Sequence, residues 1–263
     1  MAQDTASPPL PGFLKLLAHE VRWQLLTALT ESDLRVQELV ERLQRPQNLI
    51  SYHLRLLRDG QVVNEHRSQA DGRDVYYSLE LEHLRTLYLS SGQALHPALT
   101  TNDPLTHAEA ESPTTNRQPV RILFLCTHNS ARSQLAEGIM RQTSDFPVAV
   151  FSAGNEPGTV HPLAIRAAQH LGLDISGQRS KHLDEFSGQT FAYVITVCDR
   201  VRELCPVFTP EPHQIHWSFA DPSAVVGTEE DQFQAFLQTA RELTTRINYL
   251  RLMINRRQAH EES

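Results

Sequence analysis

The sequence predicts two domains: a mostly α winged helix-turn-helix, followed by an α/β domain with a doubly wound, four-stranded parallel sheet. Up to residue 90, apolar residues recur at helical spacing and then lead into a hairpin signal. From residue 119, strand-like apolar runs alternate with helical ones. The stretch between them is rich in Pro, Ser, Thr and Asn, which is typical of a linker. We therefore expect domains at 1–90 and 119–263, joined by a linker at 91–118.

Length and composition exclude several classes of protein. The chain of 263 residues, 40% hydrophobic and 21% charged, is long enough for two globular cores. No apolar run approaches the roughly 20 residues that a membrane helix needs. The start "MAQDTASPPLPG" lacks the basic and apolar parts of a secretory signal. We expect a cytoplasmic protein without membrane association, and the net charge of −7 does not by itself indicate nucleic-acid binding.

The helices of the first domain follow from apolar spacing. Such spacing is found around residues 13–17, 21–29 and 36–43. A further helix from Pro46 to Asp59 has Ile50, Leu54 and Leu57 on one face, and Gly60 ends it. Two strand-like runs then flank Asp71-Gly72, a strong hairpin signal. Helices followed by a β-hairpin make a winged helix-turn-helix.

The helix from Pro46 to Asp59 is the predicted recognition helix, which would enter the major groove of DNA. The first 90 residues hold 10 Lys and Arg against 12 Asp and Glu, so total charge favours an alternative, a small helical interaction module. Five arginines nevertheless lie in or beside the predicted recognition helix and wing. The residues expected to contact DNA are Gln47, Asn48, Ser51, Tyr52, His53, Arg55, Arg67 and Arg73.

The segments "HEVRWQLLTAL", "VQELVERL" and "PQNLISYHLRLLRDGQVV" resemble the ArsR-type winged-helix repressors, and the match at "SYHLRLLRDG" is specific. The resemblance implies a homodimer, formed through this domain, that binds operator DNA and releases it when a ligand binds. That ligand is often a metal or metalloid. Many arsenic sensors of the family carry a cysteine pair on the helix before the recognition helix. Here that region reads "SDLRVQELVERL", so the familiar thiolate site is absent.

The second domain opens with "VRILFLCTHNSARSQLAEG". Val120 to Leu125 is typical of a strand buried on both faces, and helical spacing begins near Arg132 or Ser133. Cys126 therefore lies at a strand end, in the spacing C-x5-R. The loop can turn backbone N–H groups toward an oxyanion, and the helix dipole and Arg132 favour negative charge there. We expect this field to lower the pKa of Cys126, which would attack a phosphoryl group or arsenate.

A general acid is needed for the leaving oxygen, and Asp221, before Pro222, is the candidate. It lies after the strand-like "HQIHW"; an ordinary turn aspartate is the alternative. The residues expected to bind the oxyanion are Thr127, His128, Asn129, Ser130, Ala131, Arg132 and Ser133.

Two further cysteines follow a second core strand, in "YVITVCDRVRELCPVF". Because carboxyl ends of parallel strands meet at one edge, Cys198 and Cys126 are expected to lie close together. A simple phosphatase needs one cysteine, so Cys198 and Cys205, in a polar loop, suggest a thiol relay. Three thiolates binding zinc or arsenite are the competing interpretation, although no C-x2-C spacing is present.

"VRILFLCTHNSARSQLAEG", "FSAGNEPGTVHPLAI", "ITVCDRVRELCP" and "W-x-F-ADPSA" resemble the thioredoxin-coupled arsenate reductases, which share the low-molecular-weight tyrosine phosphatase fold. The resemblance implies that Cys126 attacks arsenate with help from Asp221. Cys198 then attacks Cys126 and releases arsenite, and Cys205 moves the disulfide to Cys198–Cys205. It also implies thioredoxin or a similar dithiol as reductant, with no bound cofactor and no metal. The catalytic set is Cys126, Arg132, Cys198, Cys205 and Asp221.

Strands are expected at 120–126, 147–153, 190–197 and 213–217, and helices near 132–143, 161–171 and 229–256. Together the motifs predict a bifunctional transcription regulator and arsenate reductase. A low-molecular-weight tyrosine phosphatase fused to a DNA-binding domain is one alternative. A repressor that senses an oxyanion or redox state without catalysis is the other.

Overall fold

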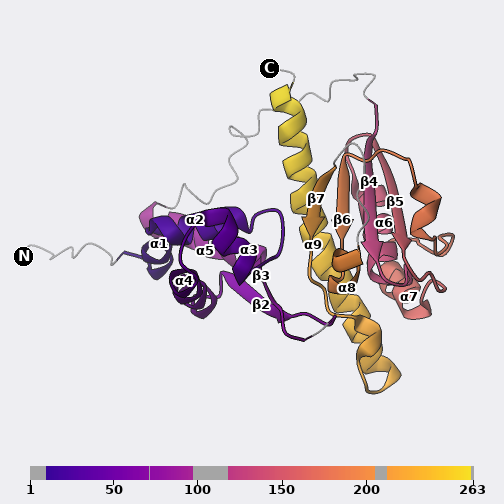
Figure 1. Cartoon of the computed structure of the whole chain (residues 1–263), viewed down its shortest axis with the longest axis horizontal. Coiled ribbons are helices and arrows are strands. Elements are labelled where there is room, and N and C mark those ends of the chain that lie inside the picture. Colours follow the sequence, from indigo (N-terminus) through magenta and orange to yellow (C-terminus); the bar gives the residue numbers. More distant parts are fainter. Residues whose placement is uncertain (1–9, 71, 97–117, 205–211, 262–263) are drawn as a thin grey trace, which may run out of the picture. The chain divides into compact units, whose positions relative to one another are not determined.

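The structure is a computed structural model that describes residues 10–70, 72–96, 118–204 and 212–261 (Figure 1). Contacts divide the chain into two compact units. One is built on the elements before residue 97 and the other on those from residue 120 onward, with segments 31–33 and 66–76 grouped with the second. Most of the predicted linker lies outside the described residues, so the domain boundaries at 90/91 and 118/119 stay predictions.

The first unit has the predicted winged helix-turn-helix architecture. Its described helices are α1 (Gly12–Leu17), α2 (Glu20–Ala28), α3 (Val36–Leu43), α4 (Gln47–Asp59) and α5 (Leu81–Leu95). Its strands β1 (Leu34–Arg35), β2 (Val63–Arg67) and β3 (Val75–Leu79) form a sheet of order β1-β3-β2. Leu25, Leu39, Ile50, Leu54 and Leu57 are fully buried between the helices. Helix α5 covers the first residues of the stretch that the sequence assigns to the linker.

The second unit contains a four-stranded parallel sheet of order β5-β4-β6-β7, which confirms the predicted fold class. The strands are β4 (Val120–Cys126), β5 (Val148–Gly154), β6 (Tyr193–Thr196) and β7 (His213–His216). The helices are α6 (Arg132–Thr143), α7 (Pro162–His170), α8 (Asp199–Leu204) and α9 (Glu229–Glu261), with 3-10 turns η3 (Leu183–Phe186) and η4 (Pro222–Ala224). Helices α6, α7 and α9 pack on one another beside the sheet (Figure 1).

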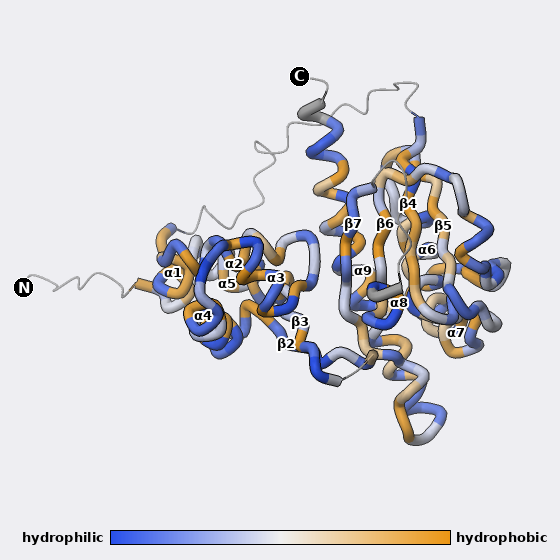
Figure 2. The backbone as a smooth tube through the Cα atoms, in the orientation of Figure 1, coloured by the Kyte–Doolittle hydropathy of each residue, from blue (hydrophilic) through white to orange (hydrophobic). Residues whose placement is uncertain are grey.

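The sheet determines where the site lies. Ile122 to Leu125 are fully buried on β4, as the continuous apolar run predicts, and hydrophobic colour runs along this strand in Figure 2. The chain passes from β4 to β5 on one side and later to β6 on the other. In such open sheets, ligands bind at the carboxyl ends of the strands where the order reverses. Cys126 ends β4 at that place.

Two elements differ from expectation. The segment "DRVREL", expected as a polar loop, forms the short helix α8, whose Val201 is buried against the sheet. Cys205 follows α8 and lies outside the described residues. Helix α9 reaches Glu261, five residues beyond the predicted end. None of the helices in the described ranges combines the length and hydropathy that a bilayer crossing requires.

Candidate active site

Cys126 occupies the end of β4, and its side chain is buried. The loop from Thr127 to Ala131 joins it to α6, which begins at Arg132. Asn129 adopts a left-handed conformation, with φ of 46°, and its backbone N–H lies 3.2 Å from Cys126 Sγ. Ser133 Oγ lies 2.8 Å from the same sulfur. The loop therefore surrounds the sulfur with hydrogen-bond donors.

The loop carbonyls are bound on the outer side of the loop. The pairs are Glu156 N–H to Thr127 O (3.0 Å), Gly158 N–H to His128 O (3.0 Å) and His161 N–H to Ser130 O (2.8 Å). In a planar peptide the N–H of the next residue points opposite to the carbonyl. Because these hydrogen bonds hold the carbonyls outward, the N–H groups point toward the inside of the loop. The result is a concave nest of the kind that binds anions.

The Asn129 side chain holds the loop in this shape. Its amide nitrogen donates to Ser133 Oγ (2.9 Å) and Ser152 Oγ (2.8 Å). Its amide oxygen accepts from Gln134 Nε2 (2.9 Å) and from Lys181 N–H (2.8 Å). The strained left-handed backbone at Asn129 is thus fixed by four hydrogen bonds from one side chain. The distant partners Ser152 and Lys181 are not evident from the sequence around Asn129.

A buried carboxylate lies beneath this loop and was not identified from the sequence. Glu137 is 3% exposed, accepts a hydrogen bond from Ser152 Oγ, and pairs with Lys181 Nζ at 3.1 Å. Arg141 forms a second ion pair with it. A buried charge is tolerated only when it is paired and hydrogen-bonded. Helical spacing alone places Glu137 on α6 but does not show that it faces inward.

Gly154 is a further residue that the sequence analysis did not single out. It pairs with Cys126 in the register of β4 and β5. A Cβ at this position would lie 2.9 Å from both Cys126 O and Asn129 N, and still closer to Thr127 O. The end of β5 therefore touches the loop backbone directly, and only glycine leaves room for it.

Arg132 and Asp221 form an ion pair across the site. Arg132 is 7% exposed; its Nη1 donates to Phe219 O at 2.8 Å, and its Nη2 lies 3.0 Å from Asp221 Oδ2. Asp221 also accepts from Ser223 N–H at 3.0 Å, at the start of η4. Burial acts to raise the pKa of Asp221, but Arg132 and Ser223 together hold that pKa below its usual range. Asp221 is therefore ionised in this structure.

The pKa of Cys126 corrects an expectation. The sequence predicts a lowered pKa, whereas burial raises the pKa of this thiol and the neighbouring Cys198 raises it further. Arg132 and Ser133 act in the opposite direction without reversing the shift. The physical reason is that the sulfur is buried, which disfavours the charged thiolate more than Arg132 and Ser133 favour it. The two shifts together favour a protonated Cys126 thiol and an ionised Asp221 carboxylate.

Cys198 lies beside the loop, as the strand-end argument predicts. It follows β6 by two residues, its side chain is buried, and its Sγ is 3.4 Å from Thr127 Oγ1. Strands β4 and β6 are hydrogen-bonded neighbours, with Leu125 opposite Thr196. Two thiols thus meet at adjacent strand ends. The placement of Cys205 falls outside the described residues.

A buried polar chain fixes the start of α8 next to Cys198. Asp199 Oδ1 lies 3.2 Å from His216 Nε2, and Thr196 Oγ1 lies 2.8 Å from His216 Nδ1. Burial lowers the pKa of His216, so this ring is neutral; we assign its proton to Nε2 because the partner is a carboxylate. Burial would raise the pKa of Asp199, but the hydrogen bond from His216 helps to keep that pKa low. These contacts join residues from three separate segments and could not be predicted from the sequence.

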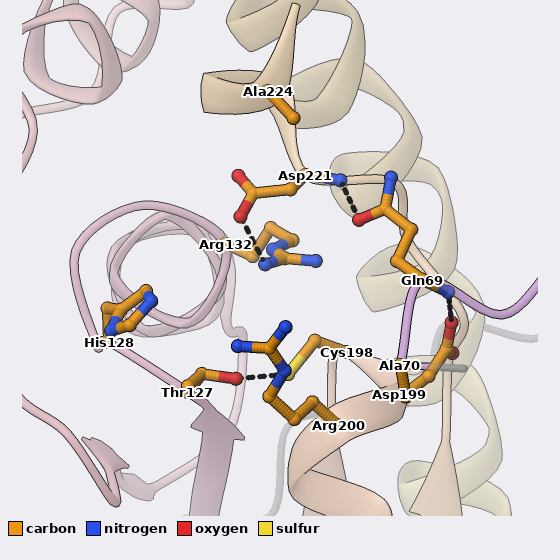
Figure 3. A pocket seen from close by; sticks show the side chains of 10 residues that line it. All are labelled: Gln69, Ala70, Thr127, His128, Arg132, Cys198, Asp199, Arg200, Asp221 and Ala224. Atoms are coloured by element: carbon orange, nitrogen blue, oxygen red, sulfur yellow. Dashed lines mark hydrogen bonds and ion pairs between the residues drawn. The ribbon is translucent and has the colours of Figure 1, made fainter. Parts of the chain in front are cut away.

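A pocket lies beside the loop, Cys198 and Asp221, and Figure 3 shows the side chains that line it. Of the predicted oxyanion-binding residues, Thr127, His128 and Arg132 line it, while Asn129, Ala131 and Ser133 are buried behind them. Ser130 contributes the carbonyl already described. Within the described ranges, no group of three or more His, Cys, Asp or Glu residues has metal-binding geometry. The lining residues are Gln69, Ala70, Thr127, His128, Arg132, Cys198, Asp199, Arg200, Asp221 and Ala224.

The predicted DNA-contacting residues lie on α4 and on the hairpin of β2 and β3, and one of them is not accessible. Those that are exposed are Gln47, Asn48, Ser51, Tyr52, Arg55, Arg67 and Arg73. His53 is 3% exposed, and its ring packs on that of His19 at 4.3 Å between centroids. His53 is thus a core residue of α4, because its position in the helix falls on the buried face with Ile50 and Leu57.

Burial lowers the pKa of His53, and the nearby His19 and Arg22 lower it further. Its folded pKa lies below its unfolded value, so the stabilisation is complete above about pH 6.5 and is lost as the pH falls through the folded pKa. We expect the protection of α4 amides, taken relative to the intrinsic exchange rate at each pH, to fall in acid, and His53→Gln to reduce this fall. Peptide-resolved hydrogen exchange tests this, and the same comparison above pH 8 measures the cost of the substitution itself. An equal loss of protection in the variant would contradict it.

Comparison with known proteins identifies both parts of the chain. Residues 121–259 match the family model of the low molecular weight phosphotyrosine protein phosphatases. The matched residues make up more than half of the chain. The chain belongs to this phosphatase family. Residues 19–65 match the model of the bacterial regulatory proteins of the arsR family, so the first unit carries an ArsR-family helix-turn-helix.

The relatives of this phosphatase-family chain include proteins that carry the name arsenate reductase. Those of Halalkalibacterium halodurans and Bacillus subtilis are each 37% identical over 126 residues, which cover 48% of this chain and 91% of the relative. A solved structure titled an arsenate reductase in the phosphate binding state is 29% identical. It covers 51% of this chain and 98% of its own, with a TM-score of 0.43.

Proposed function

We propose that this chain is both an arsenate reductase and an operator-binding transcription regulator of the cytoplasm. The observation that carries the reductase part is the position of Cys198, whose sulfur lies 3.4 Å from the hydroxyl of the residue that follows Cys126. A phosphatase needs one nucleophilic sulfur, and a second thiol at the neighbouring strand end has no role in hydrolysis. The arsenate reductases among the relatives support the choice of substrate.

The first step begins with an exchange of partners at Arg132. Arsenate enters the nest and takes the guanidinium from Asp221, which then has an anion rather than a cation beside it. This raises the pKa of Asp221, and the proton moves from the Cys126 thiol to the Asp221 carboxyl group. The Cys126 thiolate attacks arsenic and forms an S–As bond. One As–O bond breaks, and its oxygen leaves as water with the proton from Asp221.

The second step transfers two electrons to arsenic. The Cys198 thiolate attacks Cys126 Sγ, an S–S bond forms, and the electron pair of the S–As bond stays with arsenic, which leaves as arsenite. Cys205 then attacks Cys198, so that Cys126 is released as a thiolate and the disulfide becomes Cys198–Cys205. Thioredoxin or another dithiol reduces this disulfide. No bound cofactor or metal takes part in these steps.

The regulator part rests on the exposed face of α4 and on apolar side chains that the first unit leaves uncovered. In α1 and α5, the exposed apolar residues are Leu14, Tyr88, Leu89 and Leu95. Exposed apolar patches of this kind mark interaction surfaces, and a homodimer formed through these helices would cover them. Such a dimer would present two copies of α4 to an operator with two half-sites. Two arginines are already in ion pairs: Arg58, in the last turn of α4, with Glu65, and Arg45, just before α4, with Glu20.

The reductase proposal is tested with purified protein, thioredoxin, thioredoxin reductase and NADPH. We expect NADPH oxidation that depends on arsenate and yields one arsenite for each NADPH. Binding of labelled operator DNA, measured by gel shift with the same preparation, tests the regulator part. Hydrolysis of p-nitrophenyl phosphate without arsenite formation would favour the second candidate, a phosphatase, since Cys126, Arg132 and Asp221 suffice for that reaction.

Gly154→Ala tests the shape of the loop. The added methyl group would meet loop backbone at three atoms, so the nest must shift. A displacement near 1 Å can cost about 100-fold in rate, and we expect kcat/KM for arsenate to fall on that scale. Gly158→Ala is the matched control, because a Cβ there meets nothing within 4 Å although its N–H also binds the loop. Equal activities of the two variants would contradict this account.

A further inference from the structure

Arg200 is a pocket residue to which neither the sequence motifs nor the reaction steps assign a role. It lies in α8, two residues after Cys198, and its side chain is exposed. It lines the same pocket as Arg132 and Thr127. Figure 3 shows its guanidinium turned into the pocket beside Thr127 and Cys198, facing the guanidinium of Arg132.

The two arginines differ in what they already bind. Arg132 donates to Phe219 O and pairs with Asp221, so its charge is offset before any oxyanion arrives. The part of the chain that the structure describes offers Arg200 no hydrogen-bond or ion-pair partner. The nearby carboxylate of Asp199 is bonded to His216 instead. Arg200 is therefore the cation of this pocket whose donors remain available.

A tetrahedral oxyanion with two negative charges needs more compensation than one guanidinium supplies. When such an anion takes Arg132 from Asp221, a third negative charge lies beside it, on Asp221 at first and on the Cys126 thiolate once the proton has moved. Two like charges a few Å apart repel strongly in a partly buried site. A second guanidinium on the opposite side of the anion offsets this repulsion and donates to oxygens that Arg132 does not reach.

We propose that Arg200 is a second oxyanion-binding residue, which with Arg132 makes the pocket select doubly charged over singly charged tetrahedral oxyanions. The inference rests on the proposed function only for naming arsenate as the substrate. Its test uses inorganic phosphate, which has the same shape and charge states and requires no electron transfer.

The experiment is calorimetric titration of the reduced full-length protein with inorganic phosphate at pH 6 and pH 8. We expect wild type to bind more tightly at pH 8, where phosphate is mostly the dianion. Arg200→Gln should weaken binding at pH 8 about tenfold, the scale of one charge-assisted hydrogen bond, and lose most of the preference for pH 8. Arg200→Lys, which keeps the charge, should retain that preference.

The controls separate this role from others. His128, Cys198, Asp199 and Asp221 are ionisable residues that also line the pocket, but they are common to all variants, so differences between variants isolate position 200. Arg241→Gln removes the same charge from an exposed position of α9 outside the pocket lining, and it should bind phosphate like wild type. Thermal unfolding checks that each variant is folded.

Several outcomes would overturn the inference: wild type that does not bind phosphate, or Arg200→Gln that binds like wild type at both pH values. In arsenate turnover we expect Arg200→Gln to have a higher KM than wild type and a kcat within about twofold of the wild-type value. A lowered kcat with unchanged KM would assign Arg200 to the Cys198 thiol and also overturn it. If phosphate binding depends on Arg200 but no arsenite forms, the inference stands and the proposed reductase function fails.

Discussion

Replacement of Cys198 by Ser is expected to abolish arsenite formation and to spare phosphoester hydrolysis. The variant keeps the nest, Arg132 and Asp221, so Cys126 can still attack arsenate or p-nitrophenyl phosphate. A serine hydroxyl cannot attack Cys126 Sγ to displace arsenic, because it has no sulfur with which to form a disulfide. We expect arsenate-dependent NADPH oxidation to fall by about a thousandfold or more, the scale seen when a participating nucleophile is removed. Hydrolysis of p-nitrophenyl phosphate should change by less than about threefold.

Cys126→Ser is the matched control, because it should remove both activities. Cys198 is buried, and Ser differs from Cys by one atom, so the fold should persist; thermal unfolding of both variants checks this. Sustained arsenite release from the Cys198 variant would show that an external thiol attacks Cys126 directly. That result would remove the relay while leaving the first step intact.

Asp221→Asn is expected to lower kcat/KM for arsenate by about 100-fold or more and to change the direction of its pH dependence. In wild type the active free protein holds one proton between Cys126 and Asp221. Activity should decline in acid as the pH falls through the lowered pKa of Asp221. It should also decline in alkali, as the pH rises through the raised pKa of Cys126. The wild-type plateau is therefore wide.

The variant has no carboxyl group to receive the thiol proton, so only the Cys126 thiolate form can react. Its kcat/KM should rise with pH through the pKa of Cys126, where that of wild type falls. Arsenate itself titrates equally with both proteins, so the ratio of the two profiles cancels that contribution. A variant profile parallel to that of wild type would rule out Asp221 as the residue that exchanges the proton.

The fold was predictable because its signals are local. Four apolar residues in a row marked β4, and the helical spacing after Arg132 marked α6, which begins at that residue in the structure. Helix α8 was missed because its six residues, "DRVREL", are too few and too polar to show an apolar period. Helix α5 continued into the predicted linker because Leu95 lies among small and polar residues that mask the helical pattern.

The site was predictable where it is contiguous in sequence and not where it depends on distant packing. Cys126, Arg132 and the loop between them could be read together. Gly154 and Lys181 come from other segments, and nothing in their own sequence neighbourhoods shows that they touch this loop. The raised pKa of Cys126 was missed for the same reason. Burial depends on all the elements around the sulfur, whereas the sequence revealed only the nearby arginine and the helix dipole.

Because β4 and β6 are hydrogen-bonded neighbours, the two thiols stand at adjacent strand ends without any special loop to bring them together. An ancestral domain with a single reactive sulfur would therefore gain an internal electron donor through one codon change just past the adjoining strand. Loss of the same side chain would return it to hydrolysis. In this architecture, the first internal electron donor is about one mutational step away, and the Cys198–Cys205 disulfide of the proposed relay requires a second step.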